Sequence, residues 1–281
     1  MTRVALVEPY LGGSHRAWAD GYAEHSAFDV SVFGLPAVNW KWRMQGAHVT
    51  IADQLVGDAR INGPFDALLC SDMVDVAGLL GLLRDRAGRP SVALFMHENQ
   101  LTFPLPPDER RDLTYAMTNW TSMLAADVVV FNSEHHRADW FGALPGLLRA
   151  MPDVRHTASI EAVHPRSVVA PVGIDVAALI EPPRVRGPRP LVLWNQRWQW
   201  DKGPDRFVDA MIALAERFDG FDVAVTGARG ADMSDRHRLR AALGERIVHD
   251  GFAPPDAYRR LLRSSDVVVS LSLIHISEPT R

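Results

Sequence analysis

Short apolar runs alternate with amphipathic stretches of helical length along most of this chain of 281 residues. Each run is rich in valine, leucine and alanine and is bounded by turn residues, as buried strands are. Five runs come first: Val4–Val7, Ala67–Cys70, Val92–Met96, Asp127–Phe131 and Val168–Val172. Between them, Val74–Arg86 and Asp112–Ala126 space their apolar residues as helices do. This alternation predicts an α/β fold with a mostly parallel sheet covered on both faces.

A proline-rich segment divides the alternation into two parts. Residues Glu181–Pro190 contain four prolines and one glycine, which is the composition of a linker. The alternation then resumes with predicted strands Leu191–Trp194, Val223–Thr226, Ile247–His249 and Asp266–Val269 and predicted helices Pro204–Phe218, Asp235–Leu243 and Pro255–Arg263. We therefore expect two Rossmann-like domains, residues 1–180 and 191–270, joined by the linker 181–190. Ligands of such sheets bind outside the carboxyl ends of the strands, so a cleft between the domains is expected to hold the site.

The end of the chain differs in character from the rest. The string Leu271–Arg281 looks like the translation of a transposon adapter used in sequencing libraries. We interpret residues 271–281 as a non-native tail and exclude them from the fold prediction. On this interpretation the native sequence ends near Ser270, and the second domain, with about 80 residues, is incomplete.

Composition excludes several classes of protein. A net charge of −4 does not indicate a protein that coats nucleic acid, although a local basic face remains possible. Cys70 is the only cysteine, which excludes an internal disulfide and fits a reducing compartment. The first residues read as a strand rather than a signal peptide, and no apolar run approaches the roughly 18 to 20 residues that span a bilayer. We therefore expect a soluble, cytoplasmic protein without a membrane span.

A cationic turn follows the first strand of the second part. It contains Arg197 and Lys202, and Gly203 ends it directly before a predicted helix. The free N–H groups and the dipole of a helix start favour anions, and arginine and lysine add charge-assisted bonds to phosphate oxygens. Among 30 basic residues only Lys41 and Lys202 are lysines. Cations are otherwise disfavoured at a helix start, so the turn predicts a nucleotide diphosphate site rather than a pair of solvated surface cations.

Glycines and polar residues follow two strands of the first part. Gly12 and Gly13 would let a ligand approach the backbone and leave N–H groups free, although an ordinary flexible turn is the commoner explanation for such a pair. The segment His97–Gln100 ends strand Val92–Met96, where four polar groups are costly unless they face water or a substrate. His97 could hydrogen-bond a sugar hydroxyl or assist proton transfer. The alternative is a polar cap on the next segment.

Two further segments have competing interpretations. Trp40-Lys41-Trp42-Arg43 alternates aromatic and cationic groups, as in surfaces that stack bases or sugars and contact phosphate. The alternative is a strand edge or loop that packs against the core. The sequence Asn132-Ser133-Glu134 favours a helix cap. The adjacent His135 and His136 have no ligand partner at zinc-motif spacing, so no metal site is expected there.

Taken together, these segments resemble the family-4 retaining glycosyltransferases of GT-B fold. In that family the Arg-x4-Lys-Gly turn holds the diphosphate of a nucleotide sugar, and Arg197, Lys202 and Gly203 match it. Pro171–Asp175 resembles the family's Pro-Asn-Gly-Ile-Asp element, with Val172 in the usual asparagine place.

A narrower resemblance, to the tRNA-queuosine α-mannosyltransferase group, covers nearly all of residues 1–270. The motifs that carry it are Glu8–His15, Trp40–Arg43, His97–Leu101 and Trp194–Lys202. This resemblance implies a metal-independent retaining enzyme that moves mannose from GDP-mannose to queuosine in tRNA, with the nucleotide sugar as co-substrate and no other cofactor.

The resemblance also implies a role for each matched residue. The catalytic residues would be Arg197, Lys202 and His97, the donor-binding residues Gly12, Gly13, Asn195 and Gly203, and the acceptor-binding residues Glu98, Asn99, Trp40 and Trp42. The family's Glu-x7-Glu element is expected after Ser270, where the adapter-like tail stands. Two other hypotheses stay open: a GT-B transferase acting on a lipid, glycan or small metabolite, which the weak basicity favours slightly, and a nucleotide-binding fragment without catalysis.

Overall fold

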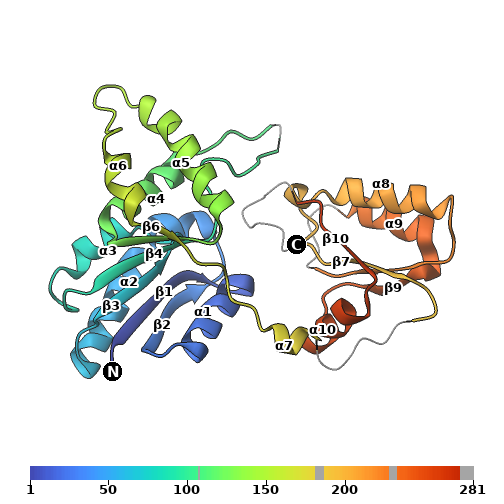
Figure 1. Ribbon diagram of the computed structural model, residues 1–281, viewed down its shortest axis with the longest axis horizontal. Coiled ribbons are helices and arrows are strands. Elements are labelled where there is room, and N and C mark those ends of the chain that lie inside the picture. The colour runs from blue at the N-terminus through green and yellow to red at the C-terminus, as the bar shows by residue number, and fades with distance from the viewer. Residues whose placement is uncertain (107, 181–186, 228–232, 273–281) are drawn as a thin grey trace. The chain divides into compact units, whose positions relative to one another are not determined.

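The computed structural model describes residues 1–106, 108–180, 187–227 and 233–272 (Figure 1). These residues form two compact units: unit 1 holds residues 1–103 and 110–173, and unit 2 holds the remaining described residues. Most of the predicted linker (181–186) and of the predicted non-native tail (from 273) lies outside the described residues.

Unit 1 is built on a six-stranded sheet in the order β2-β1-β3-β4-β5-β6, and every neighbouring pair is parallel (Figure 1). The strands are β1 (Arg3–Leu11), β2 (Asp29–Pro36), β3 (Ala67–Ser71), β4 (Ser91–Met96), β5 (Val128–Phe131) and β6 (Ser167–Val169). The predicted α/β fold is thus confirmed, and all five strands predicted for the first part are present. The carboxyl ends of all six strands share one edge of the sheet.

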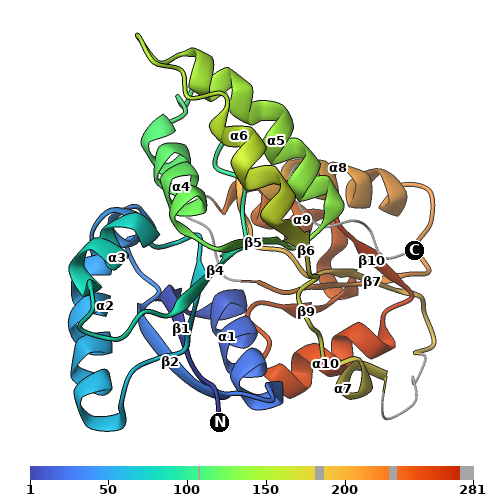
Figure 2. The same ribbon diagram turned by 60° about the vertical axis from the view of Figure 1, so that its left-hand side comes forward.

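Helices cover the sheet unequally. They are α1 (Gly13–His25), α2 (Trp40–Asn62), α3 (Val76–Leu83), α4 (Leu113–Ala125), α5 (Glu134–Arg149) and α6 (Ser159–Val163), followed by the 3-10 turn η1 (His164–Arg166). Successive residues of β1 point to opposite faces, so Ala5 and Val7 join a large core with α2 to α5, while Val4 and Leu6 pack with Trp18 of α1. Figure 2 shows α1 and α2 on opposite sides of β1.

The segment from Trp40 is a helix. Trp40 begins α2, which runs for 23 residues to Asn62. The alternative interpretation of this segment as a strand edge or loop is therefore wrong. Neither α2 nor the edge strand β2 was predicted from the sequence.

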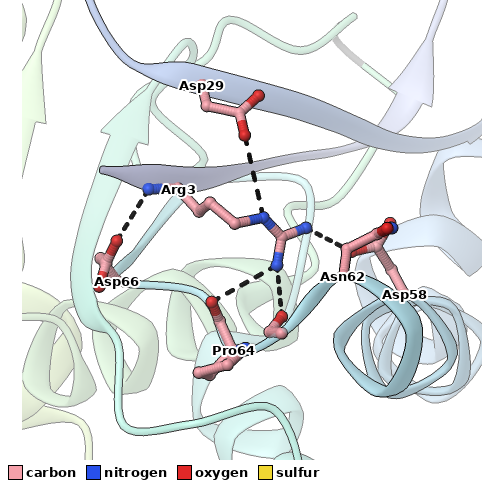
Figure 3. Close-up of polar contacts among 7 residues, drawn as sticks. Arg3, Asp29, Asp58, Asn62, Pro64 and Asp66 are labelled. Atoms are coloured by element: carbon pink, nitrogen blue, oxygen red, sulfur yellow. Dashed lines mark hydrogen bonds and ion pairs between the residues drawn. The ribbon is translucent and has the colours of Figure 1, made fainter. Parts of the chain in front are cut away.

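Arg3 forms several polar contacts at the amino end of the strands of the unit 1 sheet (Figure 3). Its backbone N–H donates to Asp66 Oδ2 at 2.8 Å, and its guanidinium donates to Asp58 Oδ1 at 2.6 Å and to the Pro64 carbonyl at 3.4 Å. The guanidinium also lies 3.9 Å from Asp29 Oδ2. These contacts join β1, β2, α2 and the segment before β3 at the amino ends of the strands, opposite the carboxyl ends, so Arg3 serves stability.

Unit 2 has a four-stranded parallel sheet in the order β10-β7-β8-β9. The strands are β7 (Leu191–Trp194), β8 (Asp222–Val225), β9 (Ile247–Asp250) and β10 (Val267–Val269). The helices are α7 (Val176–Ile180), α8 (Pro204–Ala215), α9 (Ser234–Leu243) and α10 (Pro255–Ser264). Two 3-10 turns, η2 (Trp200–Lys202) and η3 (Gly244–Arg246), complete the unit. Every strand and helix predicted after the linker is present within a few residues. In the core, Trp194 stacks on Phe207 with ring centroids 4.5 Å apart.

None of the helices in the described part of the chain combines the length and the hydrophobicity of a transmembrane segment.

Candidate functional site

Three polar side chains meet at the carboxyl end of the unit 1 sheet. Glu8 belongs to β1 and is fully buried, His15 lies in the first turn of α1, and His97 directly follows β4. His15 Nδ1 hydrogen-bonds Glu8 Oε2 at 2.9 Å, and His97 Nε2 lies 3.6 Å from the same oxygen. The Tyr10 N–H donates to Glu8 Oε1 at 2.9 Å. The carboxylate is therefore fixed at both oxygens and faces two imidazoles.

The two imidazoles have opposite pKa shifts. Burial alone lowers the pKa of His15, but its hydrogen bond to Glu8 and the charges of Glu8, Asp72 and Glu98 outweigh this effect, so the pKa is raised. Burial lowers the pKa of His97 to about 3, helped by the charges of His15 and His136. At neutral pH His97 is consequently uncharged and offers one donor and one acceptor nitrogen. Its Nε2 is buried without a hydrogen-bond partner among the described residues.

The same three residues have the ligand types of a metal site. Their ligand atoms lie within 4.8 Å of one another, the only such group in the ranges that the structure describes. His15 Nδ1 and Glu8 Oε2 already bond each other, so a cation would have to displace the shared proton.

The paired glycines open α1. Gly12 is the N-cap, and a Cβ on it would lie 2.5 Å from the Cβ of Ala37, so no side chain fits. Gly13 has φ +53°, a conformation that favours glycine. The first N–H groups of a helix lack intrahelical partners. Those of Gly13 and Ser14 are therefore suitable for an anion or a sugar hydroxyl.

The loop after β4 contains Glu98 and Asn99, the two residues predicted to bind the acceptor from this loop, and they differ in exposure. Glu98 is partly exposed, whereas Asn99 is 2% exposed. Asn99 Nδ2 donates to Asp139 Oδ2 at 2.8 Å, and Asn99 Oδ1 accepts from the Leu101 N–H at 2.9 Å. The side chain of Asn99 therefore shapes the loop that carries His97.

Asp72, which the sequence analysis missed, lies directly after β3 and is fully buried. Its Oδ2 accepts the Glu98 N–H at 3.1 Å, and its carbonyl accepts from Asn119 Nδ2 at 2.8 Å. Burial raises the pKa of Asp72 to about 7, the charge of Glu98 adds to this, and that of His15 opposes it. Its position at the end of an apolar strand is the same signal that identified His97.

The turn after β5 holds the backbone of His97 through a hydrogen bond from Asn132. Asn132 Nδ2 donates to the His97 carbonyl at 3.1 Å, and Asn132 Oδ1 lies 3.1 Å from His136 Nδ1. Ser133 caps α5 by accepting the His136 N–H at 3.1 Å, so the predicted cap is confirmed. Burial lowers the pKa of His136 to about 4. His136 is thus a neutral buried support, while its neighbour His135 is exposed.

Trp40 and Trp42 occupy different environments at the start of α2. Trp40 packs against Tyr115 of α4 with ring centroids 5.1 Å apart and keeps 38% of its surface exposed. Trp42 is 62% exposed. Only Trp42 therefore presents most of its indole to solvent.

In unit 2 the cationic turn joins β7 to α8. Arg197 is exposed and forms no ion pair or hydrogen bond through its side chain with the described residues. Lys202 Nζ lies 2.9 Å from Asp201 Oδ2 and donates at 3.3 Å to the Oγ of Ser272, a residue of the predicted non-native tail. Gly203, with φ +64°, is the N-cap of α8. Arg197 is therefore free to adjust to an anion, whereas Lys202 is held at the start of the helix.

Contacts with other elements of unit 2 hold this cationic turn in place. Asn195 Nδ2 donates to Tyr258 Oη at 3.1 Å. Trp198 is buried, with the Arg236 guanidinium 5.8 Å from its ring centroid. Arg236 itself is 1% exposed and pairs with Asp250. No sequence signal identified this ion pair, because its two members come from separate elements, α9 and β9.

Glycine also allows a close approach to the turn. Gly227, directly after Thr226, has φ +98°, and a Cβ there would lie 2.3 Å from the Gln196 carbonyl oxygen. The segment that follows β8 therefore contacts the turn at Gly227, where only glycine fits.

Comparison with known proteins identifies the family. The profile of the family described as tRNA-queuosine alpha-mannosyltransferase N-terminal matches residues 3–174, more than half of the chain and all of the unit 1 site. The chain belongs to this family. It is also 27% identical over 278 residues to the Drosophila melanogaster protein named tRNA-queuosine alpha-mannosyltransferase, covering 95% of this chain and 72% of that one.

Solved structures support the predicted GT-B fold. Sucrose-phosphate synthase from Thermosynechococcus elongatus matches with a TM-score of 0.64 at 15% identity, over 97% of this chain and 76% of that chain. The trehalose-6-phosphate synthase OtsA matches with a TM-score of 0.63 at 14% identity, over 97% and 79% of the two chains. The chain is therefore a glycosyltransferase of GT-B fold, as the sequence resemblance implied.

Proposed function

We propose that this glycosyltransferase moves mannose, with retention, from GDP-mannose to queuosine in tRNA. The observation that carries the proposal is the family match over residues 3–174, a region that contains Glu8, His15 and His97. The Drosophila melanogaster relative, named for the same reaction, extends the likeness to 95% of the chain. The identities of sugar, nucleotide and acceptor rest on this likeness, and the chemistry of the residues supports their roles.

In unit 2, Arg197 and Lys202 would bind the diphosphate of the donor. When the bond from the anomeric carbon to the diphosphate oxygen breaks, its electron pair goes to the departing GDP. These two cations and the amino end of α8 would stabilise that negative charge, and such stabilisation is usually the largest contribution to catalysis. The pairing of Lys202 with Asp201 keeps the ammonium in place before the donor arrives.

In unit 1, His97 would bind a sugar hydroxyl. An uncharged imidazole can donate to or accept from a hydroxyl without introducing a second charge beside the leaving group. Glu8 and His15 fix the surroundings of His97, and Asn132 holds its backbone. The N–H groups of Gly13 and Ser14, which Gly12 leaves open to a ligand, would serve the donor as well.

The acceptor residues come from two segments of unit 1. Glu98 is partly exposed beside His97, where its carboxylate can accept hydrogen bonds from the cyclopentenediol of queuosine. Asn99 would act through the shape of the loop. Trp40 and Trp42 would contribute aromatic surface at the start of α2.

Isotope transfer tests the acceptor and the donor together. The protein is incubated with GDP-[14C]mannose and tRNA that either contains or lacks queuosine, and label is measured on the purified tRNA. The proposal requires label only on queuosine-containing tRNA. Label on a lipid or glycan instead would favour the second hypothesis, and GDP binding without transfer to any acceptor would favour a non-catalytic nucleotide-binding protein.

A binding measurement tests the donor site alone. Each charge-assisted bond is worth about 1.5 to 3 kcal/mol, so Arg197→Ala should weaken GDP binding roughly 10- to 150-fold in isothermal titration. Arg217→Ala removes another exposed arginine of unit 2 and should leave the affinity unchanged. Equal affinities for the two variants would remove Arg197 from the donor site.

A further inference from the structure

The indole of Trp42 lies flat over a glycine. Trp42 and Gly46 are one turn apart on α2, and a Cβ on Gly46 would lie 2.9 Å from Trp42 Cζ2 and 3.0 Å from Cε2. Real Cβ atoms essentially never show so short a contact, so any side chain at position 46 would push the indole away. The absence of a side chain at Gly46 therefore sets the orientation of the exposed ring.

Contacts of the residues on either side of Trp42 hold the start of α2 in place. The Arg43 guanidinium donates to the Pro36 carbonyl at 3.3 Å from Nε and 3.2 Å from Nη2, which ties the start of α2 to the end of β2. Trp40 packs on Tyr115, which shares a buried cluster with Met44 and Met73. An aromatic surface held in one orientation loses little entropy when it binds a ligand.

Asn39, the residue that begins this segment, has a strained backbone. It is the N-cap of α2 with φ +52°, a left-handed conformation, and its side chain forms no capping bond to the helix. Residues held in such conformations cluster at ligand sites. The exposed carboxamide of Asn39 is available to a ligand, because the helix does not use it.

The chemistry of the surface fits an unpaired nucleobase. Trp42 is 62% exposed, and the apolar side chain of Val49, two turns along α2, is 52% exposed. Lys41 is exposed between the two tryptophans, with its Nζ 5.7 Å from the Trp40 ring centroid. A planar aromatic face beside a cation and a free amide can stack a base, contact its phosphate and bond its edge.

This surface lies at the same end of the unit 1 sheet as the site formed by Glu8, His15 and His97. Helix α2 begins after the carboxyl end of β2, at the sheet edge that also carries Glu8 and His97. Tyr10 connects the two regions, since it packs on the cluster that contains Tyr115 and its ring centroid lies 5.7 Å from that of His15.

We propose that Trp42, seated on Gly46, is a stacking platform for an unpaired base in the RNA loop that carries the acceptor nucleotide. The inference rests on the proposed function, in which the acceptor is tRNA. It goes further by assigning recognition of the loop to one oriented indole, with Trp40 as its structural support. Base stacking tolerates any base, so the platform would recognise an unpaired loop rather than a particular sequence.

The experiment measures RNA affinity by fluorescence anisotropy with two labelled probes, an RNA hairpin with an unpaired loop and a fully paired RNA of equal length. Trp42→Ala and Gly46→Leu should each weaken hairpin binding roughly 5- to 150-fold, the range for loss of one stacked base. Binding to the paired RNA should not change. The salt dependence of hairpin binding should also stay the same, because no phosphate contact is removed.

Two control variants separate stacking from folding. Gly57→Leu places the same side chain on α2 where a Cβ meets nothing within 4 Å, and it should keep wild-type affinity. Trp42→Phe keeps an aromatic face and should retain intermediate affinity. Thermal unfolding of all variants, followed by circular dichroism, should agree within a few degrees.

Each outcome bears on a different statement. Hairpin binding that survives Trp42→Ala or Gly46→Leu overturns the platform and leaves the proposed function standing. Equal losses for hairpin and paired RNA, or a loss in Gly57→Leu, also overturn it. If the wild-type protein binds GDP but neither RNA, the tRNA acceptor itself is wrong and the platform falls with it.

Discussion

The substitution Gly12→Ala tests how tightly the start of α1 is built into unit 1. The new Cβ would lie 2.5 Å from the Cβ of Ala37, in the segment between β2 and α2. Two methyl groups normally stay about 3.5 to 4.0 Å apart. The two segments must therefore separate by roughly 1 Å, which would shift the N–H groups that open the helix.

The energetic cost follows from this overlap. Gly12 has φ −167°, extended backbone that alanine adopts without strain, so the contact with Ala37 is the main penalty. Adding a methyl group to a well-packed site costs typically about 1 to 3 kcal/mol. For a unit of this size, 1 kcal/mol lowers the melting temperature by about 2 to 4 °C. We expect the unit 1 transition to fall by roughly 2 to 12 °C.

A double-substitution cycle gives the assay its control. Ala37→Gly removes the Cβ that Gly12→Ala would strike, so the double variant should recover most of the lost stability in differential scanning calorimetry. The coupling between two residues in contact is typically about 0.5 to 3 kcal/mol. GDP-mannose affinity should follow the same pattern, since the Gly13 and Ser14 amides return to their places. Additive losses in the double variant would refute the explanation by contact.

Three further substitutions have different readouts. The pKa of Asp72 is raised from 3.8 to about 7, so native protein binds more protons than unfolded protein in that window and its stability falls as pH rises through it. Asp72→Asn should flatten this decline, as measured by urea unfolding at pH 5 and pH 8. Arg3→Met removes the hydrogen bonds to Asp58 and the loop carbonyls and should cost about 1 to 3 kcal/mol in urea unfolding, with GDP affinity unchanged. Arg236→Met leaves Asp250 paired with Arg240, so it should destabilise unit 2 by about 1 to 3 kcal/mol and, by loosening Trp198, also weaken GDP binding in titration calorimetry.

Much of the fold was predictable because parallel strands buried on both faces consist of uninterrupted apolar residues. Val92–Met96 and Leu191–Trp194 are examples, and both became strands. The edge strand β2 is only half buried and gives no such run. Helix α2 buries two alanines on its core face and carries glycines at positions 46 and 57, so its apolar periodicity contrasts weakly with the polar face.

The site was predictable where it follows the ends of strands. His97, the glycine pair and Asn132 all come directly after a strand, and the same rule would have found Asp72. Glu8 could not be assigned a partner, because its bond to His15 depends on the turn geometry of Gly12 and Gly13. The pairing of Arg236 with Asp250 likewise depends on how α9 packs beside β9.

Trp40 and Trp42 show why the type of element had to be known before a role could be assigned to either residue. In a strand, Trp40 and Trp42 would point to the same face, because side chains repeat every two residues. In a helix, residues two apart are rotated by about 200° around the helix axis, so their side chains point to nearly opposite sides. Trp40 therefore turns toward Tyr115 and Trp42 toward solvent over Gly46. In the roles proposed above, Trp40 is the support and Trp42 the binding residue, a difference that the alternating aromatic and cationic pattern alone did not indicate.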